Sequence, residues 1–279
     1  MNINFFNQLN FYKIFILSTV YITSCSTNFE QLEKKNGLKY SIDSNKPFSG
    51  FVSEVYDNGN IKLKGHYLNG KKDGFWTEWN KIGFKFREST WKNGKPVKVT
   101  KFDYYDNRNI KEEISYKDGV RFGKSYNWYE NGRKKSEEIY DDGEKNGLCI
   151  RWYIEGNKIN EIIYEDGKRN GLSTWWNVKG QKTSEGTYNN GIKNGVFTHW
   201  YENGSLKQKG TFKDGKRNGL RFYWHLNGEK KSKWTYKDGK KDGESIFWHE
   251  NGKKRLEILY NDGEINFKKE WNQYGLLLK

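Results

Sequence analysis

The chain is poor in several residue types on which ordinary globular domains depend. Its 279 residues include two prolines, two cysteines and one methionine, and only 34% of the residues are hydrophobic. So few apolar residues cannot fill a deep aliphatic core, and two cysteines cannot form a disulfide framework. The 30 glycines recur at regular positions between segments rich in aromatic residues, which argues against a disordered chain.

Sequence motifs of enzyme active sites are also missing. The chain has no Gly-x-Ser-x-Gly, no His-Glu-x-x-His and no pair of catalytic carboxylates, and Gly-Lys-Arg-Asn-Gly lacks the Gly-Lys-Ser/Thr ending of a phosphate-binding loop. His225 and His249 occupy equivalent places in adjacent repeats, on hairpins expected to lie about 10 Å apart, too far to share a metal ion. We expect no enzymatic activity, no metal and no cofactor.

Aromatic residues, in contrast, make up 17% of the chain and recur with a fixed period. A Trp or Tyr returns every 24 residues in each of two series, and such a period is typical of a repeat architecture. Each ring buries roughly 150–250 Å², so one or two rings per strand can hold a thin sheet together. The predicted structural anchors are Trp79, Trp128, Trp152, Trp176, Trp200, Trp224 and Trp248, and Tyr140, Tyr164, Tyr188, Phe212 and Tyr236.

Two strands per period, joined by two kinds of turn, predict an all-β antiparallel meander or solenoid of about nine 24-residue units over residues 37–279, with a C-terminal cap from about 264. Asn-Gly at 203–204 and equivalent sites is expected to form a tight hairpin with both residues at positive φ. The second connection, Asp-Gly-Lys-Arg-Asn-Gly, is expected to be longer.

The two faces of this sheet should differ in polarity. Counting back in twos from each Trp gives a mostly apolar series, such as Leu172, Thr174 and Trp176. The alternate positions are more polar but include Trp175, Tyr223 and Phe247, which we take as candidate binding residues. Cys149 lies on a predicted strand between Leu148 and Ile150 and is expected to be an inert packing residue.

The N-terminus differs from the rest of the chain. Residues 1–24 contain one charged side chain, Lys13, and the apolar run Ile14–Ile22, which is too short to span a bilayer but suits the core of a signal peptide. The run ends in Ile22-Thr23-Ser24-Cys25, which resembles the bacterial lipobox. The resemblance implies an exported lipoprotein of the cell envelope, with Cys25 as the lipidation site, residues 25–36 as a tether, and the outer membrane or cell surface as the favoured location.

The formal charge of +15 predicts salt-dependent attraction to anionic partners. Basic pairs recur at turns along one expected edge of the ribbon, and two interpretations are open for them. They could form a solvated edge that prevents strand pairing, or a strip that binds anionic lipid or glycan. Nucleic acid is not expected as a partner of an exported protein. The basic candidate binding residues are Lys168, Arg169, Lys216, Arg217, Lys240 and Lys241.

The segments Tyr-Glu-Asp-Gly-Lys-Arg-Asn-Gly-x4-Trp at 164–176 and Trp-Tyr-Glu-Asn-Gly at 200–204 resemble the bacterial variant of the MORN repeat. This resemblance implies a β-hairpin repeat used for binding, and many such proteins are labelled antitoxin components of toxin–antitoxin systems. Our leading hypothesis is a membrane-anchored scaffold that binds a partner protein. Binding of an anionic envelope glycan or phospholipid, and an antitoxin or immunity role, remain alternatives.

Overall fold

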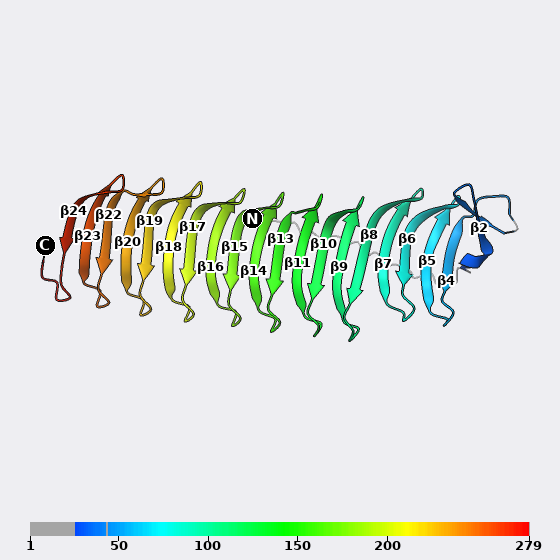
Figure 1. The fold of residues 1–279 in the computed structure, drawn as a ribbon, viewed down its shortest axis with the longest axis horizontal. Helices are drawn as coiled ribbons and strands as arrows, with labels where there is room; N and C mark the ends of the chain where they lie inside the picture. Colours follow the sequence, from blue (N-terminus) through cyan, green and yellow to red (C-terminus); the bar gives the residue numbers. More distant parts are fainter. Residues whose placement is uncertain (1–25, 43, 279) are drawn as a thin grey trace, which may run out of the picture.

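The computed structural model describes residues 26–42 and 44–278, so the predicted signal peptide and Cys25 lie outside the described residues. The fold is all-β, as predicted. Figure 1 shows strands lying side by side in chain order along an elongated ribbon. From β4 onward consecutive strands pair antiparallel, with the short β12 and β13 sharing the partner β11 and β21 and β22 sharing β20, so the sheet is a continuous meander.

Most repeats contribute two strands of eight or nine residues, and in two repeats one strand is divided in two (β12/β13 and β21/β22). The strands of the array are β4 Gly50–Val55, β5 Ile61–Leu68, β6 Lys71–Trp79, β7 Lys85–Lys92, β8 Lys95–Tyr104, β9 Ile110–Lys117, β10 Val120–Trp128, β11 Lys134–Asp141, β12 Glu144–Lys145, β13 Gly147–Trp152, β14 Lys158–Glu165, β15 Lys168–Trp176, β16 Lys182–Asn189, β17 Ile192–Trp200, β18 Leu206–Lys213, β19 Lys216–Trp224, β20 Lys230–Lys237, β21 Lys240–Lys241, β22 Gly243–Trp248, β23 Lys254–Asn261 and β24 Glu264–Glu270.

The two kinds of turn are the reverse of the sequence prediction. The tight two-residue turn is Asp166-Gly167, where φ is 45° and 74° and Glu165 pairs directly with Lys168. At Asn203-Gly204 only the glycine has positive φ, 83°. The Asn203 side chain accepts a hydrogen bond from the backbone N–H of Ser205. This bond fixes Asn203 in a longer turn, which is closed by a β-bulge at Trp200. The prediction ignored this side-chain bond.

The deepest burial is found in a single row of side chains that crosses the middle of the sheet. We call the side of the sheet that bears this row the packed face, and the opposite side, which bears Trp176 and its equivalents, the tryptophan face. Neighbours in the row are cross-strand partners, for example Ile162 with Ser173 and Phe197 with Gly210. The row is Val52, Gly65, Trp76, Ser89, Ile114, Ser125, Glu138, Cys149, Ile162, Ser173, Gly186, Phe197, Gly210, Arg221, Trp234, Ser245 and Ile258. It is interrupted at β8, where Ser89 pairs with Val99 and Ile114 with Lys101, and where Thr100 pairs with Ser115 on the tryptophan face.

Large and small side chains mostly alternate along this row, and glycine is required beside the largest ones. A Cβ added to Gly65 would overlap the indole of Trp76, and one added to Gly186 would overlap the ring of Phe197. Neither glycine has positive φ, so the requirement is for space and not for backbone conformation. On the tryptophan face the small side chains Thr174 and Thr198 are buried as well, but the aliphatic ones are open, since Leu172 is 47% exposed. The core of each repeat therefore lies on the face that the sequence predicts to be more polar.

Part of the predicted tether is folded. Thr27–Asn28 (β1) pairs parallel with β4, the 3-10 turn η1 spans Phe29–Gln31, and β2 (Leu32–Lys35) forms a hairpin with β3 (Leu38–Ser41). Leu32 packs with Val52, Tyr67 and Trp76 in a buried cluster. These segments cover the first strand of the array, so residues 26–36 contribute an N-terminal cap.

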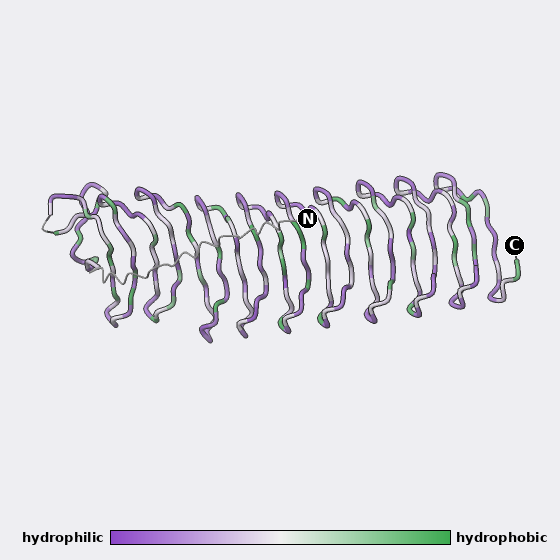
Figure 2. Tube along the Cα trace, turned by 180° about the vertical axis from the view of Figure 1, so that it is seen from behind, coloured by the Kyte–Doolittle hydropathy of each residue, from purple (hydrophilic) through white to green (hydrophobic). Residues whose placement is uncertain are grey.

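At the other end β24 pairs with β23, and an isolated bridge joins Trp271 to Leu277. All of β24 except Glu270 is exposed. Figure 2 shows hydrophilic residues concentrated at the turns, while hydrophobic segments lie within the strands. The topology places the two-residue turns along one long edge of the ribbon and the Asn-Gly turns along the other.

Candidate functional site

The predicted tryptophan anchors connect adjacent repeats. The hydroxyl of Tyr129 donates to the carbonyl of Trp152 at 2.7 Å, and Tyr201 donates to Trp224 at 2.8 Å. Lysines lie over several of the indoles, such as Lys158 with its Nζ 5.8 Å from the Trp176 ring centroid. Where the residue after the Trp is a tyrosine, its hydroxyl thus connects one repeat to the next, whereas Asn80 and Asn177 at the same place bond within their own turns.

The second series of anchors lies on the packed face, and each ring receives a cation from the preceding turn. The guanidinium of Arg169 lies 5.3 Å from the ring centroid of Tyr188, and that of Arg217 lies 5.4 Å from Tyr236. Arg217 also donates to the Tyr236 hydroxyl at 3.3 Å. Lys241 relates to Tyr260 in the same way, with its Nζ 4.9 Å from the ring centroid.

The basic pairs therefore divide into two roles. The second residue of each pair, Arg169, Arg217 or Lys241, stacks on a ring within the protein. The first residue, Lys168, Lys216 or Lys240, is exposed at the edge, and Lys240 lies 2.9 Å from Asp262. The sequence pattern does not distinguish the two members of a pair, because both are cationic and they are adjacent.

One slot on the packed face changes its chemistry from repeat to repeat. It is the residue just before each Trp, or before the residue in the equivalent place, and we call it the variable slot. It is acidic in the first repeats and mostly aromatic in the later ones. Its occupants in chain order are Glu54, Glu78, Asp103, Asn127, Arg151, Trp175, His199, Tyr223, Phe247 and Glu270.

The structure brings Tyr223 and Phe247 together but places Trp175 elsewhere. Tyr223 and Phe247 line a pocket of about 810 Å³, in which Trp234 meets Phe247 edge to face with ring centroids 4.8 Å apart. Trp175 lines a smaller pocket of about 300 Å³ with Phe197 and His199. The pKa of His199 is lowered by burial and by the nearby Arg221, which favours a neutral imidazole there.

The larger pocket is strongly cationic. Lys207, Arg217, Lys231 and Arg255 line it, against the single carboxylate of Glu250, which is largely exposed. The alternation of the buried row breaks beside this pocket, because Arg221 and Trp234 are adjacent and both large. Trp234 is only half-buried, while its other neighbour, Ser245, is fully buried.

Arg221 is a buried cation with little compensation. It is 7% exposed, its Nε donates to the Tyr223 hydroxyl at 2.8 Å, and its Nη1 has no hydrogen-bond partner among the described residues. Its guanidinium lies 5.6 Å from the ring centroid of Phe212 and 5.4 Å from that of Tyr223. No carboxylate of the described residues lies within ion-pair distance of it.

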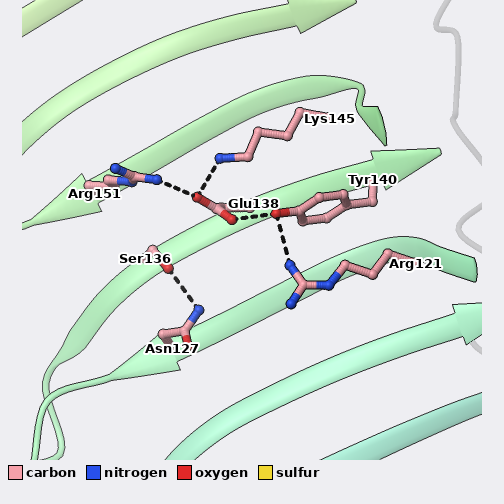
Figure 3. A network of polar contacts seen from close by, with 7 residues as sticks. All are labelled: Arg121, Asn127, Ser136, Glu138, Tyr140, Lys145 and Arg151. Carbon is pink, nitrogen blue, oxygen red and sulfur yellow. Dashed lines mark hydrogen bonds and ion pairs between the residues drawn. The ribbon is translucent and has the colours of Figure 1, made fainter. Parts of the chain in front are cut away.

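Glu138, a buried acid in the same row, has the opposite character (Figure 3). Lys145, Arg151 and Tyr140 donate to its carboxylate at 2.7, 3.1 and 2.7 Å. Burial opposes ionisation, but these three bonds lower the pKa of Glu138 to about 2. Tyr140 is bonded in turn by Arg121, and its pKa is raised to about 12, first by burial and then by Glu138. The Glu138 charge is satisfied within the fold, which identifies this network as structural.

The remaining candidate groups show no arrangement typical of catalysis. His249 contacts the carbonyl of Trp271 at 3.2 Å, in the slot that Tyr fills in other repeats. Burial raises the pKa of the Cys149 thiol, which is 4% exposed in the buried row. Within residues 26–42 and 44–278, no three His, Cys, Asp or Glu side chains are grouped to hold a metal ion. The same residues contain no helix of the length and apolarity needed to cross a membrane.

The pocket lies in repeats that match a known family model. Residues 193–214, 217–238 and 241–262 match the MORN repeat variant. The three matches begin at intervals of 24 residues, so they confirm the predicted period for three consecutive MORN-variant repeats. Tyr223, Trp234 and Arg217 all lie within these MORN-variant repeats. No curated protein sequence matches the chain.

Likenesses to solved structures are weak. The TcdB2-TccC3-Cdc42 complex aligns with 79% of this chain at 12% identity and a TM-score of 0.28, and the Tc holotoxin pore of Photorhabdus luminescens aligns with 80% at 12% identity and 0.22. A protein of unknown function from Bacteroides fragilis aligns with 82% at 9% identity and 0.08, over 96% of its own chain. This chain spans 13% and 15% of the first two. Likenesses this weak indicate neither fold nor function.

Proposed function

We propose that this protein is a non-enzymatic binding scaffold, anchored to a bacterial cell envelope through Cys25, that recognises a partner protein with its packed face. The observation that carries the proposal is the variable slot. Trp anchors, turn glycines and stacked cations repeat along the array, while this one slot runs from Glu78 through Arg151 to Phe247. A constant framework with a changing surface residue is the arrangement that repeat proteins use for recognition. A toxin neutralised at the envelope would be one such partner.

Capture of a partner from envelope extracts tests this proposal. The bait is the mature chain with Cys25→Ser, which removes the expected lipid site, and Asn127 provides a substitution that the slot already tolerates. Trp175→Asn, Tyr223→Asn and Phe247→Asn should each weaken capture of the same partner. Leu172→Asn, on the tryptophan face, is the matched control. Capture that is lost with Leu172→Asn but kept with all three slot variants would reject recognition by the packed face.

Anchoring is tested separately by metabolic labelling with an alkyne fatty acid. We expect label on the wild-type protein in the membrane fraction and none on Cys25→Ser, because only a thiol at the mature N-terminus can accept the diacylglyceryl group. Unlabelled, uncleaved protein in the cytoplasmic fraction would contradict the anchor and leave partner binding as a separate question.

A second candidate function is binding to anionic lipid or glycan at the edge formed by the two-residue turns. The observation that favours it is a group of exposed lysines at two neighbouring turns, Lys213 and Lys216 at one and Lys237 and Lys240 at the next. Vesicles containing anionic lipid should bind the Cys25→Ser protein at low salt and release it at high salt. Binding that survives the combined change Lys216→Gln and Lys240→Gln would reject this edge as the binding surface.

A further inference from the structure

The large pocket on the packed face presents aromatic ring surfaces and positively charged side chains that remain accessible to a ligand. Its rings, Tyr223, Trp234 and Phe247, are half-buried and line a space of about 810 Å³. That volume is within the range of roughly 300–1,000 Å³ found for ligand pockets. Its rim carries Lys231 and Arg255, neither of which has an ion-pair partner among the described residues.

The charge beneath the pocket has the same sign as the charge on its rim. Arg221 is the cross-strand neighbour of Trp234, donates to the Tyr223 hydroxyl and retains an unpartnered Nη1. Arginine stays protonated at any physiological pH, so this positive charge persists in a poorly hydrated place. Stacking on Phe212 and Tyr223 offsets the charge only in part. An anion near the pocket would be stabilised by Arg221 as well as by the rim.

Three neutral polar groups around the pocket are already occupied, whereas Nε2 of His225 has no hydrogen-bond partner among the described residues. The Tyr201 hydroxyl donates to the Trp224 carbonyl, the Tyr236 hydroxyl accepts from Arg217, and the indole N–H of Trp234 donates to Ser232 at 3.0 Å. Recognition of a sugar depends on several free donors and acceptors for its hydroxyls, and the three groups named above are already bonded to the protein. Ring surfaces and cations suit apolar side chains and carboxylates instead.

We infer that this pocket takes an acidic segment of the partner protein, with one aromatic or aliphatic side chain seated among Tyr223, Trp234 and Phe247 and flanking carboxylates on Lys231 and Arg255. The inference rests on the proposed function, since it assigns the chemistry of the partner at one part of the same face. The change of the variable slot from acidic to aromatic residues then determines where along the array the segment can bind. The segment should lie over Tyr223 and Phe247, between the acidic slots Glu54, Glu78 and Asp103 at one end of the array and Glu270 at the other, which would repel it.

Fluorescence anisotropy with short labelled peptides tests this inference on the mature Cys25→Ser chain. The probe is an acetylated, amidated hexapeptide, Glu-Phe-Asp-Glu-Leu-Glu. One counterpart replaces every acid by its amide, and another replaces Phe and Leu by Ser. The probe should bind more weakly as salt rises, and each counterpart should lose about tenfold or more in affinity, because each lacks one of the two recognised groups.

Variants of the protein locate the binding. Arg255→Gln and Phe247→Asn should each weaken the probe about tenfold, whereas Lys216→Gln at the turn edge removes the same charge outside the pocket and should have little effect. Circular dichroism confirms that each variant is folded. Equal affinity for the amide counterpart, or equal losses with Arg255→Gln and Lys216→Gln, would overturn the inference. So would dextran sulfate or anionic vesicles binding with the same dependence on Phe247 while the peptide does not bind.

The two proposals fail in different ways. If partner capture depends on Trp175 but is unchanged by Phe247→Asn and Arg255→Gln, the scaffold function stands and the acidic-segment inference is wrong. If the probe binds as described but no partner is captured that depends on any slot residue, the pocket chemistry stands and the proposed protein-recognition function is wrong.

Discussion

Phe197 lies across Gly186, so closely that a methyl group on the glycine would overlap the ring. The next partner of Phe197 in the sheet is again a glycine, Gly210. The Phe197 ring therefore fills the space over Gly186, while Arg221 of the following strand fills the space over Gly210. Each glycine is needed because it has no side chain to collide with a larger neighbour.

Gly186→Ala should lower the stability of the array by about 1–3 kcal/mol, the usual cost of overpacking. Chemical denaturation followed by tryptophan fluorescence measures this loss. In a Phe197→Ser background the same glycine change should cost much less, because the ring that the added methyl group meets is absent. Thr187→Ala, at the next residue, is the control and should have little effect. A Gly186→Ala midpoint equal to wild type would refute the close packing.

The Glu138 network predicts a dependence of stability on acid. Because its folded pKa of about 2 lies below the ordinary value of 4.5, Glu138 stabilises the fold above pH 4.5, and the contribution declines as the pH falls towards 2. The full shift corresponds to at most about 3 kcal/mol. Urea midpoints of wild type and Glu138→Gln should differ clearly at pH 6, differ less at pH 3 and converge as the pH approaches 2. A difference that does not depend on pH would contradict the assignment.

The division of the basic pairs predicts opposite outcomes for adjacent residues. Arg217→Gln should destabilise the fold by about 0.5–2 kcal/mol, because it removes the stacking on Tyr236 and the bond to its hydroxyl. Lys216→Gln makes the same change of charge at an exposed site and should leave thermal stability nearly unchanged. Equal shifts in melting temperature for the two variants would show that charge alone, and not stacking, decides the effect.

The two turns also predict different responses to glycine. Asp214 has φ of 48°, a conformation that glycine adopts freely, so Asp214→Gly should change stability by only a few tenths of a kcal/mol. Asn203→Gly removes the side chain that accepts the Ser205 N–H at 3.0 Å and should cost about 1 kcal/mol. Thermal denaturation of the two variants checks the order. A larger loss for Asp214→Gly would contradict the turn assignment.

The period, the meander and the sharing of faces could be predicted because they depend on residues that repeat. Trp176 and Trp200 mark the strand, Gly167 and Gly204 mark the turns, and alternation places Thr174 on the same face as Trp176. Three matched MORN-variant repeats confirm the period. Trp175, Tyr223 and Phe247 are candidate binding residues on the sequence alone because aromatic residues are conspicuous among polar alternates, and their role in binding stays a prediction.

The buried row could not be predicted in the same way, because no single residue type recurs in it from one repeat to the next along the array. Ser173, Phe197 and Arg221 occupy equivalent positions, and each is accommodated by its cross-strand neighbour and not by its own repeat. Hydrophobic periodicity does not detect a row in which glycine and serine are essential. Arg221 therefore looked like one more surface cation, and the pocket beside it had no counterpart in the sequence pattern.

The pairing of bulky and minimal residues across strand boundaries also limits how such an array can be rebuilt. Excising residues 187–210, one period, would place Gly186 beside Arg221, the same combination that Gly210 and Arg221 already form. Excising residues 199–222, a cut of equal length, would bring Phe197 against Trp234. Repeats that look interchangeable in the sequence therefore differ in which neighbours their outer strands can accept. Gene duplication or recombination can rearrange them only where the new cross-strand pair at the junction leaves room for a large side chain.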